Sequence, residues 1–553
     1  MQRPLAGLTR RNFGREALAG VTLLAIAIPL NIGYAQIAGL PPTAGLYALI
    51  VPTVLYALVV SSRQLVASPD AAAAALVASS IGGLAVAGSA DYATLAMAQA
   101  IICGVMFALL AFFKLGFLAN FLSKPILVGF VGGLALDILV SQIAKMLGVK
   151  IDSGGEFVDK VVGLVTGLPT LNVWSLLISV CAVAVLLLGR RLLPVVPWAL
   201  VVLVVATIVV VVTPAVDAGV DVLGEVPAGP PSLTWPILPW GSWLALIPSA
   251  IALTMVTVAE GLLVARAYGE KNHYPTRPNR DLLAFGVSNI AAGASGSFAM
   301  GSSTSRTAAM DQTGSRTQLP SLVLAVGTLL LLLFGTALLA DIPSPAIGAI
   351  VGVAVLPLLG IADFRTLWRL DKYEFWIGVA CFLVTLFIGA IPGIVVAFVL
   401  ALINLARRAA SPAIDVLASD DAPTDSLLDE APTGSVTAPG IIVVRMAAPL
   451  FFANGSVFGQ AVKTAITAAG GPDAVQHLVI DMEAVNDVDV TGAESFEGLR
   501  DWLDDLGISL GFSRVRAGAR PRLERFGILR DDAVYATNRA AVAALATTTP
   551  KET

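Results

Sequence analysis

The segment GSFAMGSSTSRTAAMDQTG, residues 296–314, falls where a membrane-spanning helix is due, yet it is polar. It contains four serines, three threonines, three glycines and Arg306. In hydrocarbon every backbone N–H and C=O needs a partner, so a polar break at membrane depth is tolerated only where it lines a cavity or is packed in protein. The segment therefore predicts an interrupted helix at a functional site.

The composition around this segment is that of a polytopic α-helical membrane protein. The 553 residues are 57% hydrophobic and 13% charged, whereas a soluble domain carries about 25% charged residues. A net charge of −4 gives no indication of nucleic acid binding. The three cysteines are widely spaced, and no metal cluster, phosphate loop or nucleophile motif is visible. We therefore expect neither an enzyme nor a cofactor.

A membrane helix needs about 20 mostly apolar residues, and this rule predicts fourteen spans. They cover residues 16–37, 43–60, 69–87, 92–113, 124–147, 173–190, 194–214, 241–265, 282–298, 303–313, 319–340, 344–360, 374–390 and 392–409. Lys and Arg gather in loops on one side, which the positive-inside rule assigns to the cytoplasm. With an even number of spans, both termini lie in the cytoplasm, and residues 1–15 form a cytoplasmic N-terminus.

The third and the tenth predicted spans are both interrupted. SSRQLVASPD runs into the helical AAAAALVASS, and GSFAMGSS runs into TSRTAAMDQTG. Transporters built from two inverted repeats place broken helices at corresponding points of each half, with their N-termini facing a site at mid-membrane. The interval of seven spans is the one that a seven-plus-seven duplication requires.

Two facing helix N-termini offer unpaired N–H groups and partial positive charge, which attract anions. The predicted anion ligands are Ser302, Ser303, Thr304, Ser305, Arg306, Asn31 and Ala71, the last at the start of the first interrupted helix. A structural alternative remains open, in which Ser303 caps the helix and Arg306 snorkels or pairs with an acid.

Three acids lie inside apolar spans, where a carboxylate is a functional hypothesis by default. Glu260 could carry a proton or hold a sodium ion beside the anion, or form a structural pair with an arginine. Asp70 follows Ser68 and Pro69, which are typical of an N-cap and a first helical turn, where an acid favours the helix dipole. Asp70 could also be a second protonation switch. For Asp137 we favour a packing or pairing role.

The chain changes character after Arg408. Residues 410–439 are acidic and rich in Pro and Ser, which predicts a linker. Residues 440–548 alternate strand-like and helix-like segments, which predicts a small cytoplasmic α/β domain, and residues 549–553 form a tail. The transporter domain is thus expected over residues 16–409.

Several motifs resemble one family. AGLPPTAGLY and SSRQLVASPD resemble the first three spans of the sulfate permease (SulP) anion transporters, to which prestin is related. VAEGLLVARAYGEKN and GSSTSRTAAMDQTGSRTQLP resemble their eighth and tenth spans. HLVIDMEAVNDVDVTGAESF resembles the core of their C-terminal STAS domain.

The resemblance implies fourteen spans in two inverted repeats with core and gate subdomains, a homodimer and an elevator-like movement. It also implies that Ser305 and Arg306 lie at the anion site, that Glu260 is the coupling residue, and that Thr491 is a possible phosphorylation site. Thr491 could instead be a helix N-cap following Asp489. The chain departs from many relatives at Asp70 and at Asn31.

These observations predict a secondary active transporter of small anions, of the sulfate, bicarbonate or dicarboxylate class, in a bacterial-type inner membrane. Its partners would be the anion, a coupling proton or sodium ion, and the lipid bilayer. Proton symport through Glu260 is the first hypothesis. Sodium symport is the alternative, with Thr257 and carbonyls near Gly301 as conceivable further ligands. A passive anion channel or exchanger, and a membrane-anchored regulator acting through its STAS domain, also remain open.

Overall fold

The computed structural model describes residues 5–116, 124–152, 155–193, 196–418, 431 and 434–546. The chain divides into two compact units, residues Met1–Ala401 and Leu402–Thr553. The first unit is helical, and apart from two very short strands it holds no sheet within these ranges. The second unit contains a five-stranded sheet with helices on both faces.

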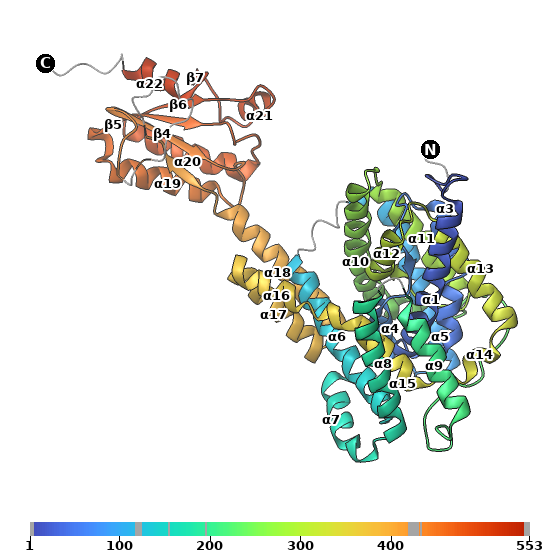
Figure 1. Ribbon diagram of the computed structural model, residues 1–553. Helices are drawn as coiled ribbons and strands as arrows, with labels where there is room; N and C mark the ends of the chain where they lie inside the picture. The colour runs from blue at the N-terminus through green and yellow to red at the C-terminus, as the bar shows by residue number, and fades with distance from the viewer. Residues whose placement is uncertain are drawn as a thin grey trace. The chain divides into compact units, whose positions relative to one another are not determined.

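The first unit is a bundle of helices of very different lengths (Figure 1). Its helices are α1 (Phe13–Ile37), α2 (Pro42–Ala48), α3 (Val51–Val59), α4 (Ala71–Ile81), α5 (Ala90–Phe112), α6 (Lys124–Leu147), α7 (Phe157–Gly167), α8 (Val173–Leu192), α9 (Trp198–Val212), α10 (Trp240–Lys271), α11 (Pro278–Ala294), α12 (Thr304–Gln312), α13 (Leu319–Phe334), α14 (Ala337–Ala340), α15 (Ser344–Val355), α16 (Ile361–Leu370), α17 (Lys372–Phe387) and α18 (Ala390–Ala410).

Each of the fourteen predicted spans overlaps an observed helix, so the polytopic helical fold is confirmed. Within the described ranges, six helices are long and apolar enough to cross a membrane, or seven if the pair 157–170 and 173–189, bent by 117°, counts as one span. Other predicted spans are shorter, as in α4, α9 and α13, because a break or a glycine ends them early. The sequence did not predict α7 and α16.

Small residues let these helices approach closely, as is usual in membrane proteins. α4 begins with five alanines, and every residue from Ala71 to Val77 is buried. At Gly129 in α6, an added Cβ would collide with the backbone carbonyl of Gly378 in α17. Alanine has the highest helix propensity, so α4 forms a regular helix although it covers only about half a membrane thickness.

The second unit confirms the predicted α/β domain of the STAS type. Its strands are β3 (Ile414–Val416), β4 (Gly440–Met446), β5 (Val475–Asp481), β6 (Ser509–Ser513) and β7 (Ala533–Tyr535), and they lie in this order in the sheet. β3 is antiparallel to β4, and the remaining neighbours are parallel.

Helices connect and cover these parallel strands. They are α19 (Gly455–Ala468), α20 (Val490–Asp505), α21 (Arg520–Arg525) and α22 (Asn538–Ala546). Alternate residues of β4 point to opposite faces: Ile442 packs in the core with α19 and α20, while Ile441 packs with α22. The sheet is therefore buried on both sides, as expected for parallel strands.

The predicted linker needs one correction. Within residues 410–439, residues Ile414–Val416 form β3 and pair with β4, so this part belongs to the sheet. The apolar residues Ile414 and Val416 pack against the core of the second unit, which explains why the acidic surroundings do not keep them out of it. Most of the remaining acidic stretch, and the predicted tail at 549–553, lie outside the described residues.

Candidate functional site

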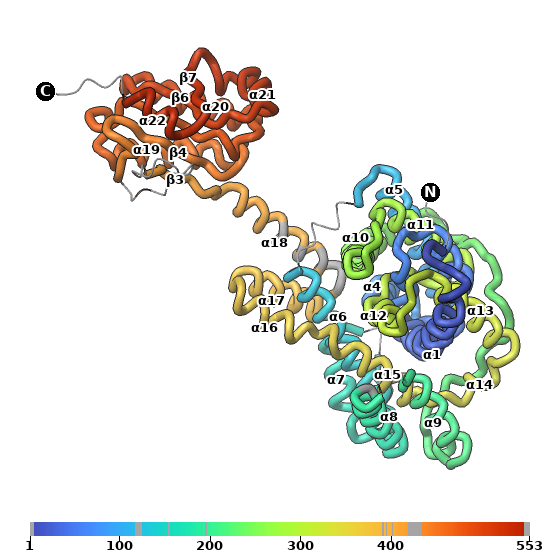
Figure 2. The backbone as a smooth tube through the Cα atoms, turned by 45° about the horizontal axis from the view of Figure 1, so that its top comes forward, coloured from blue at the N-terminus to red at the C-terminus, as the bar shows by residue number. Residues whose placement is uncertain are grey.

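The two predicted breaks meet through a short antiparallel pairing. β1 (Ala67–Ser68) pairs with β2 (Gly301–Ser302), with Ala67 opposite Ser302. The backbone N–H of Ser303 extends this pairing by donating to the carbonyl of Val66 at 3.0 Å. Each strand runs almost directly into a helix, α4 or α12, so the N-termini of both helices start from the same small sheet. In Figure 2 both helices lie between α1 and α10; α4 contacts both of these helices, and α12 contacts α1.

Both helix starts are capped by side chains. Ser303 Oγ accepts from the backbone N–H of Arg306 at 3.3 Å, as the capping alternative predicted. Asp70 itself is the N-cap of α4, because its Oδ1 accepts from the backbone N–H of Ala73 at 2.7 Å. The expected cap at Ser68 is therefore wrong by two residues. Asp70 is in the extended conformation that a cap requires, and its carboxylate offsets the positive end of α4.

Arg306 joins the two halves of the site. Its side chain is 1% exposed. Nε donates to Ser303 Oγ at 2.7 Å, and Nη2 donates to the carbonyl of Pro69 at 2.6 Å. The guanidinium lies 5.7 Å from the centre of the Tyr34 ring of α1, within range of a cation–π interaction. These contacts are to neutral groups, so the alternative in which Arg306 snorkels or is held by a hydrogen-bonded acid does not describe this arrangement.

Several buried polar atoms at the site have no partner among the described residues. They are Arg306 Nη1, Ser68 Oγ, Ser302 Oγ and Asn31 Oδ1. Asn31 lies on α1 one turn before Tyr34, and its Nδ2 donates to the carbonyl of Ala27. Buried polar groups in proteins are normally hydrogen-bonded, because an unpaired one costs about 1–3 kcal/mol. Arg306 Nη1 and the two serine hydroxyls can donate, whereas Asn31 Oδ1 can only accept. Three unpaired donors beside two helix N-termini are the arrangement expected of an anion site.

The remaining predicted ligands differ in their exposure to solvent. Ser302, Ser303 and Ala71 are buried, whereas Thr304 and Ser305 are exposed. The first turn of α12 therefore faces both the protein interior and an accessible space. Such a position suits a site that exchanges its occupant with solvent.

Glu260 borders the same small sheet. It is half-buried in α10, and a Cβ at its neighbour Gly261 would lie 3.6 Å from the Cβ of Ser302. Asp70 reaches the sheet from the other side, since a Cβ on Gly301 would collide with its carboxylate. Thr257, one turn before Glu260, is buried. The structure thus brings Glu260, Asp70 and the serines of β2 to one place.

A reciprocal pair of glutamines holds the two breaks together, and the sequence analysis missed it. Gln64 Nε2 donates to Asp311 Oδ1 at 3.0 Å and to the carbonyl of Ser315 at 2.9 Å. Gln318 Nε2 donates to the carbonyls of Ser62 and Leu65 at 3.0 and 2.9 Å. Each glutamine ends a Ser-x-x-Gln segment, SSRQ at 61–64 and SRTQ at 315–318. This repeated pattern is the signal that could have identified them.

Two further acids fix the same segments. Glu16 is fully buried and accepts from Ser315 Oγ at 2.6 Å and from the backbone N–H of Arg316 at 2.7 Å. Asp281, at the start of α11, accepts from the backbone N–H groups of Ser61 and Ser62. Both acids support the irregular backbone next to the breaks, and no sequence motif marked either of them.

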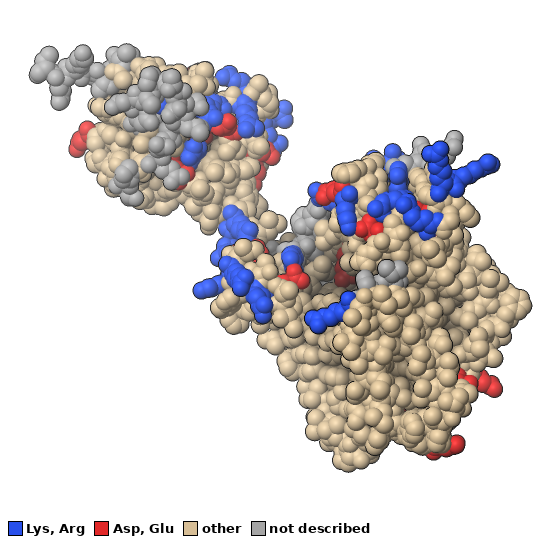
Figure 3. Space-filling model, in the orientation of Figure 1, with Lys and Arg blue, Asp and Glu red and all other residues tan. Residues whose placement is uncertain are grey.

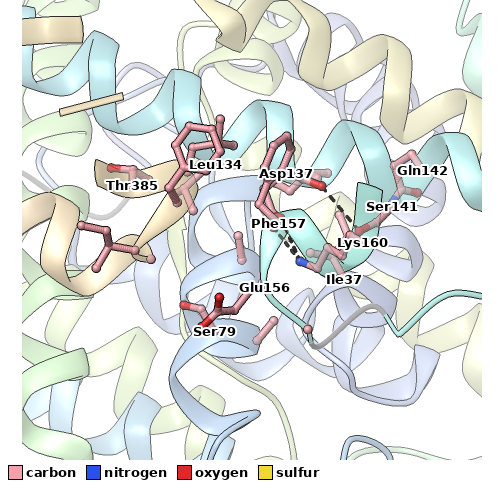
Figure 4. A pocket seen from close by; sticks show the side chains of 18 of the residues that line it. Ile37, Ser79, Leu134, Asp137, Ser141, Gln142, Glu156, Phe157, Lys160 and Thr385 are labelled. Atoms are coloured by element: carbon pink, nitrogen blue, oxygen red, sulfur yellow. Dashed lines mark hydrogen bonds and ion pairs between the residues drawn. The ribbon is translucent and has the colours of Figure 1, made fainter. Parts of the chain in front are cut away.

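Two other predicted residues have separate roles. Asp137 in α6 pairs with Lys160 in α7 at 2.8 Å, which confirms the pairing role (Figure 4). In the second unit, Thr491 is the exposed second residue of α20, and Asp489 caps that helix by accepting from the backbone N–H of Gly492. The expectation that Thr491 is the N-cap is therefore wrong, because Asp489, directly before the first residue of α20, already occupies that role.

Sequence comparisons cover nearly the whole chain. The sulfate permease family matches residues 13–381, and the STAS domain matches residues 435–541. A probable sulfate transporter of Mycobacterium tuberculosis (strain ATCC 25618 / H37Rv) is 33% identical over 539 residues, covering 97% of this chain and 96% of that protein. Sulfate transporter 3.1 of Arabidopsis thaliana is 27% identical over 544 residues, covering 94% and 82%.

Solved structures share the fold. The structure of murine Slc26a9, an anion transporter described in an inward-facing state, matches with a TM-score of 0.88 at 22% identity, covering 98% of this chain and 92% of that one. The transmembrane domain of the cyanobacterial bicarbonate transporter BicA matches with a TM-score of 0.60 at 21% identity, covering 71% of this chain and 98% of that one. At these identities the likeness concerns the fold.

Proposed function

The chain belongs to the sulfate permease family, and from this premise we propose that it is a secondary active transporter that binds a small anion between the N-termini of α4 and α12. One observation carries the proposal: Arg306 Nη1 and the hydroxyls of Ser68 and Ser302 are buried beside both helix starts and have no partner in the part of the chain that the structure describes. A bound anion would accept from these donors and from N–H groups of the first turns, including those at Ala71 and Thr304.

Ser303, Ser305 and Asn31 would shape this site from its edges. Ser303 fixes Arg306 by accepting from Nε, Ser305 faces the accessible side, and Asn31 approaches from α1. Because the site draws residues from α4, α12 and α1, a rigid movement of these helices against the remaining ones would carry the anion with it. We propose such an elevator-like movement, in a homodimer, as the transport step.

The candidate substrates are sulfate, bicarbonate and dicarboxylates. Relatives named as sulfate transporters favour sulfate, and an oxyanion can accept from several donors at once. Uptake of radiolabelled sulfate, bicarbonate and fumarate into vesicles containing the protein, each with and without an imposed proton or sodium gradient, will identify the anion and its coupling ion. Gradient-independent flux of every anion would instead favour a passive channel or exchanger.

Arg306→Ala tests the anion site itself. Removing a hydrogen bond to a charged group costs about 1.5–3 kcal/mol, so we expect anion affinity in a calorimetric titration to fall at least tenfold. Arg266→Ala is the matched control, because Arg266 is an exposed arginine that pairs with Glu270 on the surface of α10. Unchanged affinity in Arg306→Ala would assign Arg306 a purely structural role and remove the proposed site.

Proton coupling is proposed to run through Glu260. Protonation of Glu260 would remove its own negative charge beside the anion in the loaded state, where Asp70 lies against the same small sheet. Glu260→Gln should therefore abolish uptake driven by a pH gradient while anion exchange continues. Glu270→Gln, an exposed change on the same helix, should leave uptake unaltered.

Sodium symport is the alternative within the same site. Thr257 lies buried one turn before Glu260 and could supply a further oxygen ligand, together with backbone carbonyls near Gly301. Sodium-driven uptake that is lost in Thr257→Val would support this alternative. Uptake that follows the pH gradient in the absence of sodium would exclude it.

The distribution of charge supports the proposed orientation in an inner membrane. On the face shown in Figure 3, many Lys and Arg side chains of the first unit gather at the end that carries the N-terminus, and the opposite end shows Asp and Glu but no Lys or Arg. The sequence places Arg10, Arg11 and Arg15 at the start of α1, and Arg277 and Arg280 at the start of α11. By the positive-inside rule this end faces the cytoplasm.

A further inference from the structure

Two polar cavities adjoin each other near the C-terminal end of α6. The first, of about 220 Å³, is lined by residues of α1, α4, α6, α7, the end of α17 and the segment after it (Figure 4). The second, of about 350 Å³, extends towards the loops that carry Lys150, Asp221 and Ser344. Gln36, Ser141 and Lys145 line both cavities. These three side chains therefore form the partition between the two spaces.

Lys145 is the charged residue of this partition, and its surroundings are unusual for an ammonium group. It is half-buried, and its Nζ donates to Gln36 Oε1 at 3.1 Å. Among the described residues no carboxylate pairs with it. The other charged groups facing the cavities are already paired or exposed: Lys160 is bonded to both oxygens of Asp137, and the exposed groups are Glu156, Lys150 and Asp221. A half-buried ammonium without a carboxylate partner among the described residues is costly, and an anion would relieve that cost.

Gln142 points independently to a ligand in the first cavity. Its side chain is 1% exposed, and neither its amide nitrogen nor its amide oxygen has a partner within the described ranges. It belongs to the lining of the cavity, as does Ser141, whose hydroxyl donates a long hydrogen bond of 3.5 Å to the carbonyl of Asp137. An unpaired amide, a hydroxyl and an ammonium on adjacent turns of α6 would all donate to one small oxyanion.

The first cavity also approaches the site proposed above. It touches α4 at Ala75, Ala78 and Ser79. Ala75 is about one helical turn, or about 5–6 Å, beyond Ala71, where the central anion site begins. The second cavity continues away from α4 towards exposed loops. The two spaces thus form a line from the loops to the interrupted helix, divided at Lys145 and Gln36.

We propose that these cavities are the second half of the anion path, closed in this conformation, and that Lys145 and Gln142 form a second binding site for a small inorganic oxyanion on that path. The inference rests on the proposed transport function. The anion displaces Gln36 from Lys145, and this opens the partition between α1 and α6. Lys145 attracts the anion before it reaches Arg306.

Cysteine labelling of the full-length protein in lipid vesicles tests this site without measuring transport. Ser141→Cys places a thiol in both cavities, in a Cys181→Ser background because Cys181 is the exposed native cysteine and Cys103 and Cys381 are buried. The thiol is reacted with an anionic and a cationic methanethiosulfonate reagent of similar size. The ratio of the two rates reports the local potential.

We expect Lys145→Gln to lower the anionic-to-cationic rate ratio about tenfold, because a nearby unit charge acts oppositely on the two reagents. Lys150→Gln is the matched control, since Lys150 lines the second cavity but is exposed, and it should leave the ratio almost unchanged. Sodium sulfate should slow labelling of the parent and not of Lys145→Gln.

Three outcomes would overturn the proposal: an unchanged ratio in Lys145→Gln, no reaction with either reagent, or a changed ratio without protection by sulfate. Elution of each variant as a single folded species in size-exclusion chromatography shows that the result is not caused by unfolding. Failure of the proposed transport function would appear elsewhere, as anion uptake that does not depend on Arg306. It would leave these labelling rates as they are.

Discussion

The Arg306 side chain donates one hydrogen bond to each of the two interrupted spans. It donates to Ser303 Oγ in the tenth predicted span and to the carbonyl of Pro69 in the third. An arginine near the middle of a membrane costs at least about 2.5 kcal/mol. Neutral hydrogen-bond acceptors and the Tyr34 ring stabilise the guanidinium and so offset part of this cost. Nη1 of Arg306 has no partner among the described residues. An acid in the place of those acceptors would neutralise the charge that a substrate anion needs.

Gly301 provides the space in which Asp70 caps α4. An added Cβ would collide with the Asp70 carboxylate, which the backbone N–H of Ala73 holds at 2.7 Å. Gly301→Ala should therefore displace Asp70, with the loss of an N-cap worth about 1 kcal/mol. We expect a lower thermal unfolding temperature and an anion affinity at least fivefold weaker.

A double variant separates this collision from a general effect of the alanine. In Asp70→Ala/Gly301→Ala the second change should cost almost nothing further, because the clashing carboxylate is gone. Gly459→Ala in α19 is the control, since no atom lies within 4 Å of its added Cβ. Fully additive losses in the double variant would show that Asp70 and Gly301 do not compete for this space.

At the residue scale the sequence identified the parts of the site that are chemically unusual. Ser302 to Arg306 and Glu260 stood out because polar residues are costly in a membrane. Glu16 and Gln64 did not stand out: Glu16 lies at the edge of a span, and Gln64 belongs to a polar turn. Their importance comes from partners about 250 to 300 residues away in the chain, which no local pattern reveals.

At the scale of elements, the interrupted helices could be predicted but their pairing could not. β1 and β2 contain two residues each, far too few to give an alternating pattern. α7 and α16 were missed because they are short and carry charged residues, as in the Lys160 and Asp363 turns. Length was the main criterion for spans, so these two short helices did not meet it.

One element of the second unit offers a pH-dependent prediction. Arg500 in α20 donates to both oxygens of Asp532 at 2.6 and 2.8 Å, just before β7. Burial raises the pKa of Asp532, but hydrogen bonds and charge from Arg500 more than offset this and hold that pKa below its usual value. The folded state therefore binds the proton less readily than the unfolded chain.

The sign of the effect follows from this lowered pKa. Stability from the pair is fully present above the unfolded pKa, about 4, and it is lost as the pH falls through the lower folded pKa of Asp532. Asp532→Asn should reduce the free energy of opening of β5 amides by about 2 kcal/mol at pH 7, measured by hydrogen exchange in the full chain.

The difference between the parent and Asp532→Asn should shrink as the pH falls below about 4, because the parent carboxylate then becomes protonated. Asp531→Asn changes the exposed neighbour and should have little effect at either pH. A difference that stays constant between pH 7 and pH 3 would show that the Arg500–Asp532 charge interaction does not stabilise this unit.

At the scale of the whole molecule, the two units have separate hydrophobic cores. One core is built from the helices of residues 28–381, and the other from the sheet and helices of residues 442–529. The composition predicted this division, because the chain changes from apolar runs to alternating strands and helices after Arg408. The position of β3 was the part that composition could not predict.

A truncation after Ala410 tests whether the first unit carries the anion site by itself. All residues of the proposed site lie before residue 313, within the first core. We expect the truncated protein to bind the transported anion with an affinity within threefold of the full chain, measured by calorimetry. Loss of binding by a protein that still inserts and elutes as one folded species would favour a regulatory role of the second unit in forming the site.

The position of the bound anion is the most direct test of the account. Crystals grown with selenate, an analogue of sulfate, would give an anomalous difference peak wherever the anion binds. The account predicts a peak within hydrogen-bonding distance of Arg306 Nη1 and Ser302 Oγ, in front of the first turns of α4 and α12. A well-occupied peak elsewhere in the first unit, with this position empty, would contradict it.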